Sequence, residues 1–514
     1  MTEDRLPFPR AELRRRTARG AVVNAAFRGG SEALVLTQGL IVTILLGPAA
    51  IGLYGIVTTT AMSVVELRRA GIEEAFVQQS DSRQEHEFQR AFTLELIVGL
   101  AFSLVLAVLA PLVALAYGDD ELVLLMLAMA YLPTAFALQA PTWIFLRRMD
   151  FLRVRIVQAV LPVVAFFVTV PLALAGLGVW SLVVGPFVGH VAAVSVGVAM
   201  SPYRLRLRFD RAARAHYFRF SWPILVSAGA LLLVQQGQIF AFDLQDGLAA
   251  AGYITLAVTL TRLADRADQI VAATIYPAIC AVRDNTRTLE EVFVKSNRLT
   301  LMWVLPFCVG VILFAPDLVT FVLGEEWRPA TILLQGLAGA ATLQQFGFNW
   351  VSFYRARGNP RPQATESAVM VTSFLGLAVP GLLVLGPPGF VAGRISSAAL
   401  VLGVRRRFVR RLLPAVSLLR LGLRATAPVA AGALSALLVR LAPWQGGRSV
   451  AAAILEIVVF LGVTALITWR AERGLLREVI GHLRAGGEPA TPLPSEPTPV
   501  APTSVGPASL PQPR

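Results

Sequence analysis

Residues 90–116 read RAFTLELIVGLAFSLVLAVLAPLVALA, a nearly unbroken apolar run. An α-helix rises 1.5 Å per residue, so about 20 such residues cross the roughly 30 Å hydrocarbon core of a bilayer. Comparable runs recur along the whole 514-residue chain, which is 55% hydrophobic and only 15% charged. A soluble domain usually has about 25% charged residues, so this composition excludes an ordinary soluble protein. The runs are too continuous for barrel strands, and the sequence predicts an all-α polytopic membrane protein.

Apolar runs bounded by charged breaks predict about fourteen transmembrane helices. They lie near 21–46, 51–72, 90–116, 121–146, 156–175, 177–199, 219–243, 248–279, 299–323, 328–354, 364–385, 389–404, 423–442 and 449–469. With the N-terminus placed inside, 39 of the 46 Lys and Arg residues fall in cytoplasmic segments. Positive residues collect on that side of membrane proteins, so we expect both termini to be cytoplasmic. The net charge of +14 therefore does not indicate a nucleic acid partner.

An internal repeat predicts two related six-helix halves. Residues 46–54 read LGPAAIGLY and residues 244–253 read LQDGLAAAGY, and each stretch joins a first long span to a second. Trp143 and Trp350 begin two further stretches that end alike, in basic residues. An even number of spans per half makes the repeats parallel, related by an axis along the membrane normal. Chance similarity between apolar segments is the alternative.

The predicted domains follow from the spans and the repeat. They are a basic arm at 1–19, a six-helix bundle at 20–200, a linker at 201–218, a second six-helix bundle at 219–412, two additional helices within 413–470, and a cytoplasmic tail at 471–514. From about residue 487 the tail is rich in Pro, Thr, Ser and Ala, so it is expected to be disordered.

Polar residues inside the predicted spans mark the candidate substrate-binding site. A charge at the bilayer centre costs about 2.5–3.5 kcal/mol or more, so charges that persist there usually face a cavity or a partner. Polar side chains at helical spacing form stripes on three spans, with Asn24, Arg28 and Glu32 on the first, Glu66 on the second, and Thr259, Arg262 and Arg266 on the eighth. Because Arg stays charged and grips phosphate with a planar fork, these stripes predict a cationic, water-filled chamber for an anionic head group. Local ion pairs, Arg28 with Glu32 and Arg262 with Asp265, are the alternative.

Carboxylates within the spans are candidates for ion coupling. They are Asp243, Asp265, Asp268 and Glu366, which could bind a coupling Na⁺ or H⁺. Satisfied contacts between helices are the alternative. We expect no metal site and no other cofactor, because the sequence has no clustered metal-ligand motif.

The sequence also lacks the motifs of an enzyme. It has no Gly-x-x-x-x-Gly-Lys phosphate loop, no His-Glu-x-x-His and no Gly-x-Ser-x-Gly. The predicted outer loops are only a few residues long, which argues against a glycosyltransferase with an outer catalytic face. The chain is therefore not expected to be an enzyme.

Several short motifs, in their order along the chain, resemble a known family. Leu45-Leu46-Gly47-Pro48, Gly52-Leu53-Tyr54, Phe76-Val77-Gln78 and Gly178-Val179-Trp180 are similar to segments of the Wzx-type polysaccharide flippases, within the multidrug/oligosaccharidyl-lipid/polysaccharide exporter superfamily. The resemblance extends over about residues 11–470. It implies two six-helix bundles in a V that opens alternately inward and outward. It also implies that Arg28, Arg262 and Arg266 face the central cavity, and that the substrate is a saccharide carried on undecaprenyl diphosphate.

Together these features predict a secondary, ion-coupled flippase in the bacterial cytoplasmic membrane. It would move lipid-linked oligosaccharide to the outer leaflet for surface polysaccharide synthesis, as a monomer among membrane lipids, beside a polymerase and glycosyltransferases. Two other functions stay open. One is a multidrug cation antiporter of the same superfamily, which should have an acidic and aromatic cavity, and the other is a non-transporting scaffold for polysaccharide assembly.

Overall fold

The computed structural model describes residues 10–68, 72–73, 76, 84–148, 150–208, 211–266, 275, 279, 282, 285–357, 361–441 and 448–484. Side chains at 10–26, 28, 211–232, 479–480 and 482–484 lie outside that description. Contacts group Gly20–Arg473 into one compact unit and the two chain ends, Met1–Arg19 and Gly474–Arg514, into another. The predicted disordered segment after residue 487 lies outside the described residues.

Every regular element of the described residues is helical, as the composition requires. The first half contains α1 (Arg10–Arg68), α3 (Gln84–Tyr117), α4 (Glu121–Met129), α5 (Leu132–Leu138), α6 (Pro141–Arg147), α7 (Phe151–Leu174) and α8 (Ser181–Met200). The second contains α9 (Arg211–Thr261), α11 (Thr286–Leu318), α12 (Ala330–Gln345), α13 (Trp350–Ala356), α14 (Arg361–Ser373) and α15 (Val379–Leu412), followed by α16 (Leu418–Arg440) and α17 (Val450–Arg484).

Ten helical stretches within the described ranges are long and apolar enough to cross a membrane, so the chain is a multi-pass all-α membrane protein. Three of the ten are interrupted in their interior by a glycine with positive φ: Gly47 at 72°, Gly247 at 74° and Gly386 at 67°. The 40-residue stretch Gly29–Arg68 would be about 60 Å long if straight, twice the thickness of the bilayer core. Glycine tolerates this backbone conformation because it has no Cβ. At each break the chain can change direction, so that one long stretch can supply two membrane crossings.

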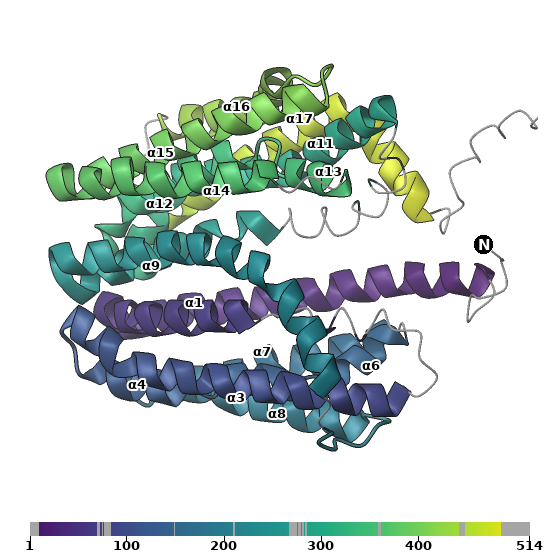
Figure 1. Ribbon diagram of the computed structural model, residues 1–514. Helices are drawn as coiled ribbons and strands as arrows, with labels where there is room; N and C mark the ends of the chain where they lie inside the picture. The colour runs from purple at the N-terminus through teal and green to yellow at the C-terminus, as the bar shows by residue number, and fades with distance from the viewer. Residues whose placement is uncertain are drawn as a thin grey trace, which may run out of the picture. The chain divides into compact units, whose positions relative to one another are not determined.

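The breaks in α1 and α9 occupy matching places in the predicted repeat. A Cβ added at Gly52 of α1 would overlap the carbonyl oxygen of Leu248, and a Cβ added at Gly252 of α9 would overlap the carbonyl oxygen of Pro48. The two contacts are reciprocal, and their members are separated by the same 200-residue interval as Gly47 and Gly247. The helices therefore touch backbone to backbone just after their breaks, and Figure 1 shows α1 and α9 side by side.

Helix boundaries depart from the sequence prediction in three places. The predicted span at 121–146 matches the membrane-length stretch Glu121–Arg147, but that stretch is divided into α4, α5 and α6, because Pro133 and Pro141 lie at the first turns of α5 and α6. The predicted linker at 201–218 is shorter, since α9 begins at Arg211, and the predicted arm is helical from Arg10. Residues 201–208 instead run along α3, where Arg208 N donates to Thr93 Oγ1 at 2.7 Å.

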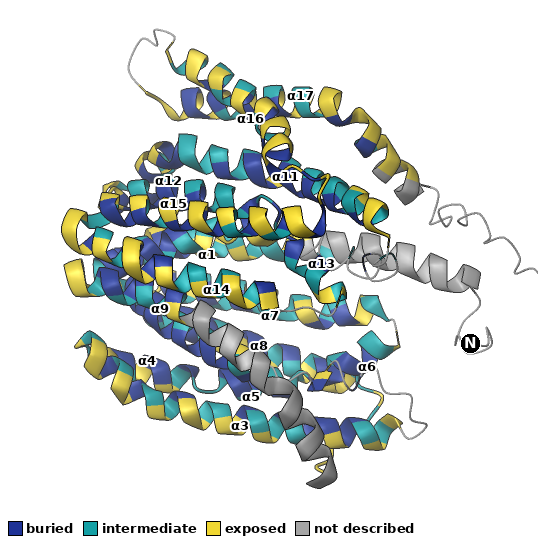
Figure 2. Ribbon diagram, turned by 45° about the horizontal axis from the view of Figure 1, so that its top comes forward, coloured by how far each residue is buried: buried dark blue, intermediate teal, exposed yellow. Residues whose placement is uncertain are grey.

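The outer helices present apolar side chains to their surroundings. Leu115 of α3 is 82% exposed and Val384 of α15 is 78% exposed, and Figure 2 shows such exposed positions along α3, α15, α16 and α17. Large contiguous apolar surfaces are rare on soluble monomers, whereas lipid tails solvate them at no cost. One cluster of buried apolar side chains draws on α1, α4, α9, α12 and α15, and a second draws on α11, α13, α15 and α16.

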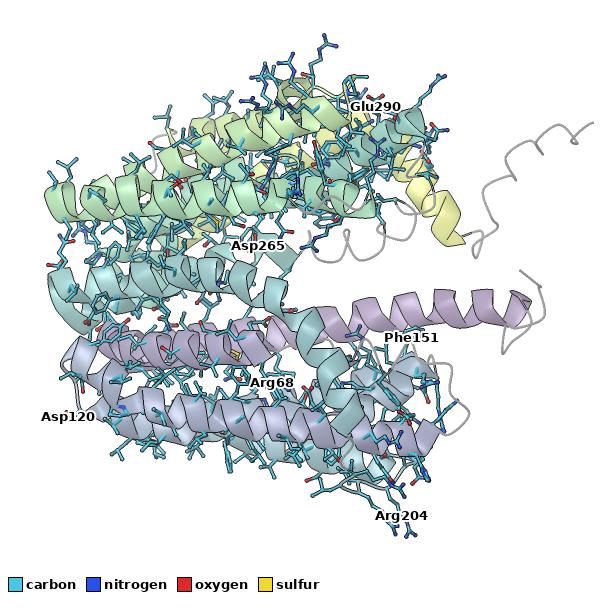
Figure 3. All side chains as sticks on the ribbon, in the orientation of Figure 1. Arg68, Asp120, Phe151, Arg204, Asp265 and Glu290 are labelled. Atoms are coloured by element: carbon cyan, nitrogen blue, oxygen red, sulfur yellow. The ribbon has the colours of Figure 1, made fainter. Side chains whose placement is uncertain are left out.

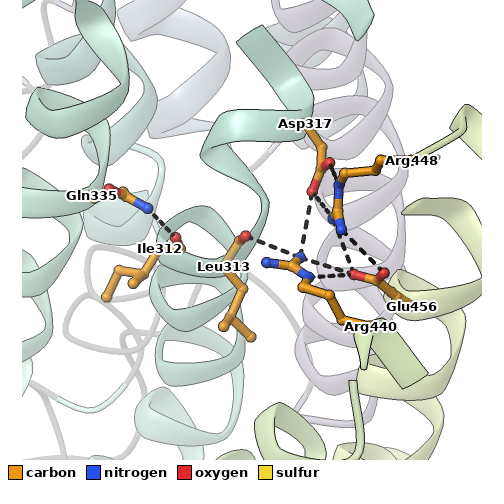
Figure 4. Close-up of polar contacts among 7 residues, drawn as sticks. All are labelled: Ile312, Leu313, Asp317, Gln335, Arg440, Arg448 and Glu456. Carbon is orange, nitrogen blue, oxygen red and sulfur yellow. Dashed lines mark hydrogen bonds and ion pairs between the residues drawn. The ribbon is translucent and has the colours of Figure 1, made fainter. Parts of the chain in front are cut away.

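Four charged residues attach α16 and α17 to α11 (Figure 4). Arg440 Nη2 lies 2.8 Å from Glu456 Oε2, and Arg448 Nη2 lies 2.6 Å from Asp317 Oδ2. The Asp317 and Glu456 side chains are 7% and 1% exposed. Hydrogen bonds to Asp317 raise the pKa of Arg448 above its usual range. At the opposite end of the same helices, Glu472 of α17 pairs with Arg298 of α11 and with Arg424 of α16.

Candidate functional site

An ion pair joins the two polar stripes that the sequence places on separate halves. Glu32 Oε1 of α1 lies 3.6 Å from Nε of Arg266, which follows α9. The side chains are 32% and 51% exposed, so neither is sealed within protein. Glu32 therefore has a partner on the opposite half of the chain. This pairing requires that the stripes of the first and eighth predicted spans face each other.

Arg262 lies one helical turn before Arg266 and is also exposed. Its Nη2 donates a hydrogen bond to Oε1 of Gln235, which lies on α9 before the break at Gly247. An amide oxygen does not neutralise the positive charge of the guanidinium, and the carboxylate of Asp265 offsets part of that charge. Thr259, one turn earlier, is exposed as well. The segment that follows α9 thus presents two arginines, of which Arg266 pairs with Glu32 on the other half of the chain and Arg262 has its charge partner, Asp265, close by in the same segment.

Asp265, whose position is labelled in Figure 3, has a hydrogen-bond partner from another helix. Its Oδ1 accepts a hydrogen bond from Nε2 of Gln345, at 3.1 Å, although Asp265 itself is exposed. Gln345 ends α12 and is buried beside a network in which Asn349 Nδ2 donates to Ser296 Oγ at 2.7 Å. Each of the two side chains takes its hydrogen bond from another segment, but the charges of Arg262 and Asp265 still attract each other, so the predicted alternative of a local pair stays open.

Glu366 is enclosed by two donors. Arg405 Nη2 lies 2.7 Å from its Oε1, and Trp350 Nε1 donates to its Oε2 at 2.9 Å. Arg405 is buried and also donates to the carbonyl oxygen of Phe346 at 2.9 Å. Through these hydrogen bonds Glu366 of α14 connects α13 and α15, and both of its carboxylate oxygens have a donor. These contacts favour the alternative of a satisfied contact between helices over the ion-coupling role predicted for Glu366, which they do not test.

Asp243 and Glu66 are the remaining predicted site residues whose side chains the structure describes. Asp243 lies on α9 before its break and is half-buried, and Glu66 is exposed on α1. The backbone at Asn24 and Arg28 is helical, but both side chains, and all of Asp268, lie outside the described residues. Among the residues described, no three His, Cys, Asp or Glu side chains gather as metal ligands.

Sequence reasoning missed the partners Gln345 and Arg405. Gln345 precedes Gly347, whose φ is 70°, and the sequence offered only a polar pair, Gln344-Gln345, within an otherwise apolar predicted span. Arg405 stood in a basic loop, where positive charge needs no other explanation than orientation. Its burial could not be inferred without knowing how α14 packs on α15.

Comparisons with known proteins match this fold. The family described as "Polysaccharide biosynthesis protein" matches residues 41–332. The succinoglycan biosynthesis transport protein ExoT of Rhizobium meliloti (strain 1021) is 23% identical over 474 residues, which cover 87% of this chain and 92% of that protein. The lipid II flippase MurJ, in its inward closed conformation, has a TM-score of 0.71 at 12% identity, over 89% of this chain and 100% of that chain. An inward-facing multidrug resistance MATE family transporter of the MOP superfamily has a TM-score of 0.61 at 15% identity, over 74% and 96%.

At these identities the solved structures establish the fold alone, which is that of MurJ and the MATE transporters. The sequence-based assignment to the polysaccharide exporters, and to transport proteins instead of enzymes, is confirmed. Because the family match covers more than half of the 514 residues, the chain belongs to the polysaccharide biosynthesis protein family.

Proposed function

We propose that the chain is a secondary flippase for oligosaccharide linked to undecaprenyl diphosphate. The observation that carries this proposal is the pairing of Arg266 with Glu32 across the two halves, with Arg262 exposed one turn away. A guanidinium binds phosphate oxygens through two parallel hydrogen bonds, which suits a diphosphate. Asn24, Arg28, Thr259 and Glu66 complete the proposed lining of the chamber.

The ion pair is weak enough to be exchanged for a substrate. Exposed pairs contribute about 0.2–1 kcal/mol, whereas hydrogen bonds to charged groups contribute about 1.5–3 kcal/mol. The diphosphate head group, entering from the cytoplasm, displaces Glu32 from Arg266 and engages Arg262 as well. Its lipid tail stays in the bilayer while the saccharide occupies the chamber.

The transport cycle requires the two halves to separate. We infer fourteen spans, because the three stretches that contain Gly47, Gly247 and Gly386 each cross twice, and α12 with α13 accounts for one further crossing. Two six-helix bundles, at 20–200 and 219–412, then rock about their contact, with the helices of 413–470 added to the second. Orientation by positive charge places both termini in the cytoplasm of a bacterium.

Coupling to an ion gradient supplies the direction, because the sequence has no ATP-binding loop. Asp265 and Asp243 are the carboxylates best placed to bind Na⁺ or H⁺, since both are at least partly exposed. Asp268 stays a candidate by its position next to the stripe. A polymerase and glycosyltransferases would consume and supply the lipid-linked saccharide.

The test is flipping of a fluorescent undecaprenyl-diphosphate oligosaccharide in proteoliposomes. We expect Arg262→Ala and Arg28→Ala to abolish flipping while the protein stays folded. Arg328→Ala is the matched control, because Arg328 lies in an outer loop with an 82% exposed side chain. Full activity of both variants would remove the cationic-site proposal. Efflux of organic cations by the wild type, without lipid flipping, would favour the multidrug antiporter, and loss of polysaccharide export on deletion of 487–514 alone would favour a scaffold.

A further inference from the structure

A cleft of about 410 Å³ lies between α12, α15 and α16, and none of its lining residues belongs to the candidate site. Its volume falls within the range of about 300–1,000 Å³ that is usual for ligand pockets. Its walls are apolar side chains except for Arg406 and Thr426. The cleft is therefore an apolar groove with one guanidinium.

The groove runs along the helices. Ala399, Leu402 and Arg406 line it from one face of α15. These spacings of three and four residues place them in a row about 10 Å long. Thr426, which lines the groove from α16, lies at the end of the groove away from the loop that joins the two helices. Arg406 lies near that loop and so marks the basic end of the groove.

Two glycines create the space. A Cβ at Gly403 would meet nothing within 4 Å, and a Cβ at Gly422 would meet only the Phe346 ring, at 3.2 Å. At each glycine no side chain fills the groove, whereas several of the other lining residues of α15 and α16 are leucines. Leu419 and Leu423, on the same side of α16, are 59% and 64% exposed. The groove is thus open toward the surroundings of the protein, which in a membrane are lipid chains.

Charge identifies the kind of lipid. Residues 401–423 contain six arginines and no Asp or Glu. Arg405 is neutralised by Glu366, whereas Arg406 is exposed and has no carboxylate partner within the described ranges. Basic pockets between transmembrane helices attract anionic head groups. A single guanidinium matches the single negative charge of a phosphodiester, while a diphosphate would call for more than one.

We propose that this groove binds one anionic glycerophospholipid of the surrounding leaflet. One acyl chain fills the space beside Gly403 and Gly422, and the phosphate pairs with Arg406. The acyl chain restores the dispersion contacts that an empty apolar groove lacks, and water is a poor occupant because the walls offer it few partners. This lipid site is separate from the chamber proposed for the transported substrate.

The test is native mass spectrometry of the purified full chain with added phosphatidylglycerol or phosphatidylcholine of the same acyl composition. We expect one retained phosphatidylglycerol per protein and at least a tenfold weaker retention of phosphatidylcholine. Gly403→Leu should fill the groove and lower phosphatidylglycerol retention at least tenfold. Gly462→Leu is its matched control, because Gly462 is exposed on α17 with nothing within 4 Å of an added Cβ.

A second pair of variants tests the head group. Arg406→Gln should remove the preference for phosphatidylglycerol over phosphatidylcholine, and Arg407→Gln, which alters a neighbouring exposed arginine outside the lining, should keep it. Wild-type retention by Gly403→Leu, or an equal effect of the two arginine variants, would overturn the proposal. Displacement of phosphatidylglycerol by equimolar undecaprenyl phosphate would also overturn it, since the groove would then hold the polyprenyl chain of the substrate.

Discussion

Glutamine substitutions at Glu32 and Arg266 separate a substrate site from a structural ion pair. The two side chains are joined by one contact of 3.6 Å between the halves. If the pair only holds the halves together, removing either member should have the same effect. If Arg266 binds the diphosphate, Glu32 competes with the substrate, and the two substitutions should have opposite effects on binding.

The expected magnitudes follow from the geometry. Two unit charges at 3.6 Å attract by about 1 kcal/mol in water, and exposed pairs retain about 0.2–1 kcal/mol. Glu32→Gln should therefore tighten binding of undecaprenyl diphosphate by up to about fivefold, by removing its competitor. Arg266→Gln should weaken binding by roughly 10- to 150-fold, because it loses a charge-assisted bond of about 1.5–3 kcal/mol. Neither change should lower the unfolding free energy by more than about 1 kcal/mol.

The assay is titration of each purified variant with undecaprenyl diphosphate, with melting temperature measured on the same samples. Lys295→Gln is a suitable control, because that side chain pairs within one helix with Glu291 at 2.8 Å. Equal weakening of binding by both glutamine variants would refute the competition. A large fall in melting temperature in both would show instead that the pair is structural.

Three further substitutions test other contacts. Gly52→Ala forces a methyl group against a backbone carbonyl of α9, so we expect a lower melting temperature and loss of flipping. Gly30→Ala is the control, because an added Cβ at Gly30 meets nothing within 4 Å, and it should change neither property. Identical melting curves for the two variants would refute the close approach of α1 and α9. Glu456→Gln breaks the buried charge cluster of Arg440, Arg448, Asp317 and Glu456, and it should lower the unfolding free energy by about 3–5 kcal/mol in denaturant titrations. A loss below about 1 kcal/mol would mean that the cluster does not hold α17 in place. Glu366→Gln should lower the stability of the protein but leave the Na⁺ or H⁺ dependence of flipping intact, because the Glu366 carboxylate already accepts hydrogen bonds from Arg405 and Trp350. Loss of the ion dependence would instead assign Glu366 to ion coupling.

Hydropathy predicted the helical, multi-pass class because the bilayer imposes it on any chain with such runs. Helical spacing also predicted that Glu32 and Arg266 lie on polar faces, and the repeat suggested that these faces correspond. Pairing was harder to predict, since it depends on how helices cross. Glu366 and its partner are 39 residues apart and come together only because α14 packs against α15. The division of the fourth predicted span was also missed, although Pro133 and Pro141 carried the signal.

The distribution of ion pairs supports movement between the halves. Where α17 meets α11, four charged residues form a network whose carboxylates are nearly buried, and a second cluster lies at the other end of the same helices. Breaking such buried pairs costs several kcal/mol, so α16 and α17 should stay with α11 throughout a transport cycle. Between α1 and the segment that follows α9, the half-exposed pair of Glu32 and Arg266 is a charged contact among the described residues, and it costs about 1 kcal/mol or less to open. A cycle driven by exchange of one carboxylate for a diphosphate would therefore part the halves at this pair and leave α16 and α17 attached to the second half.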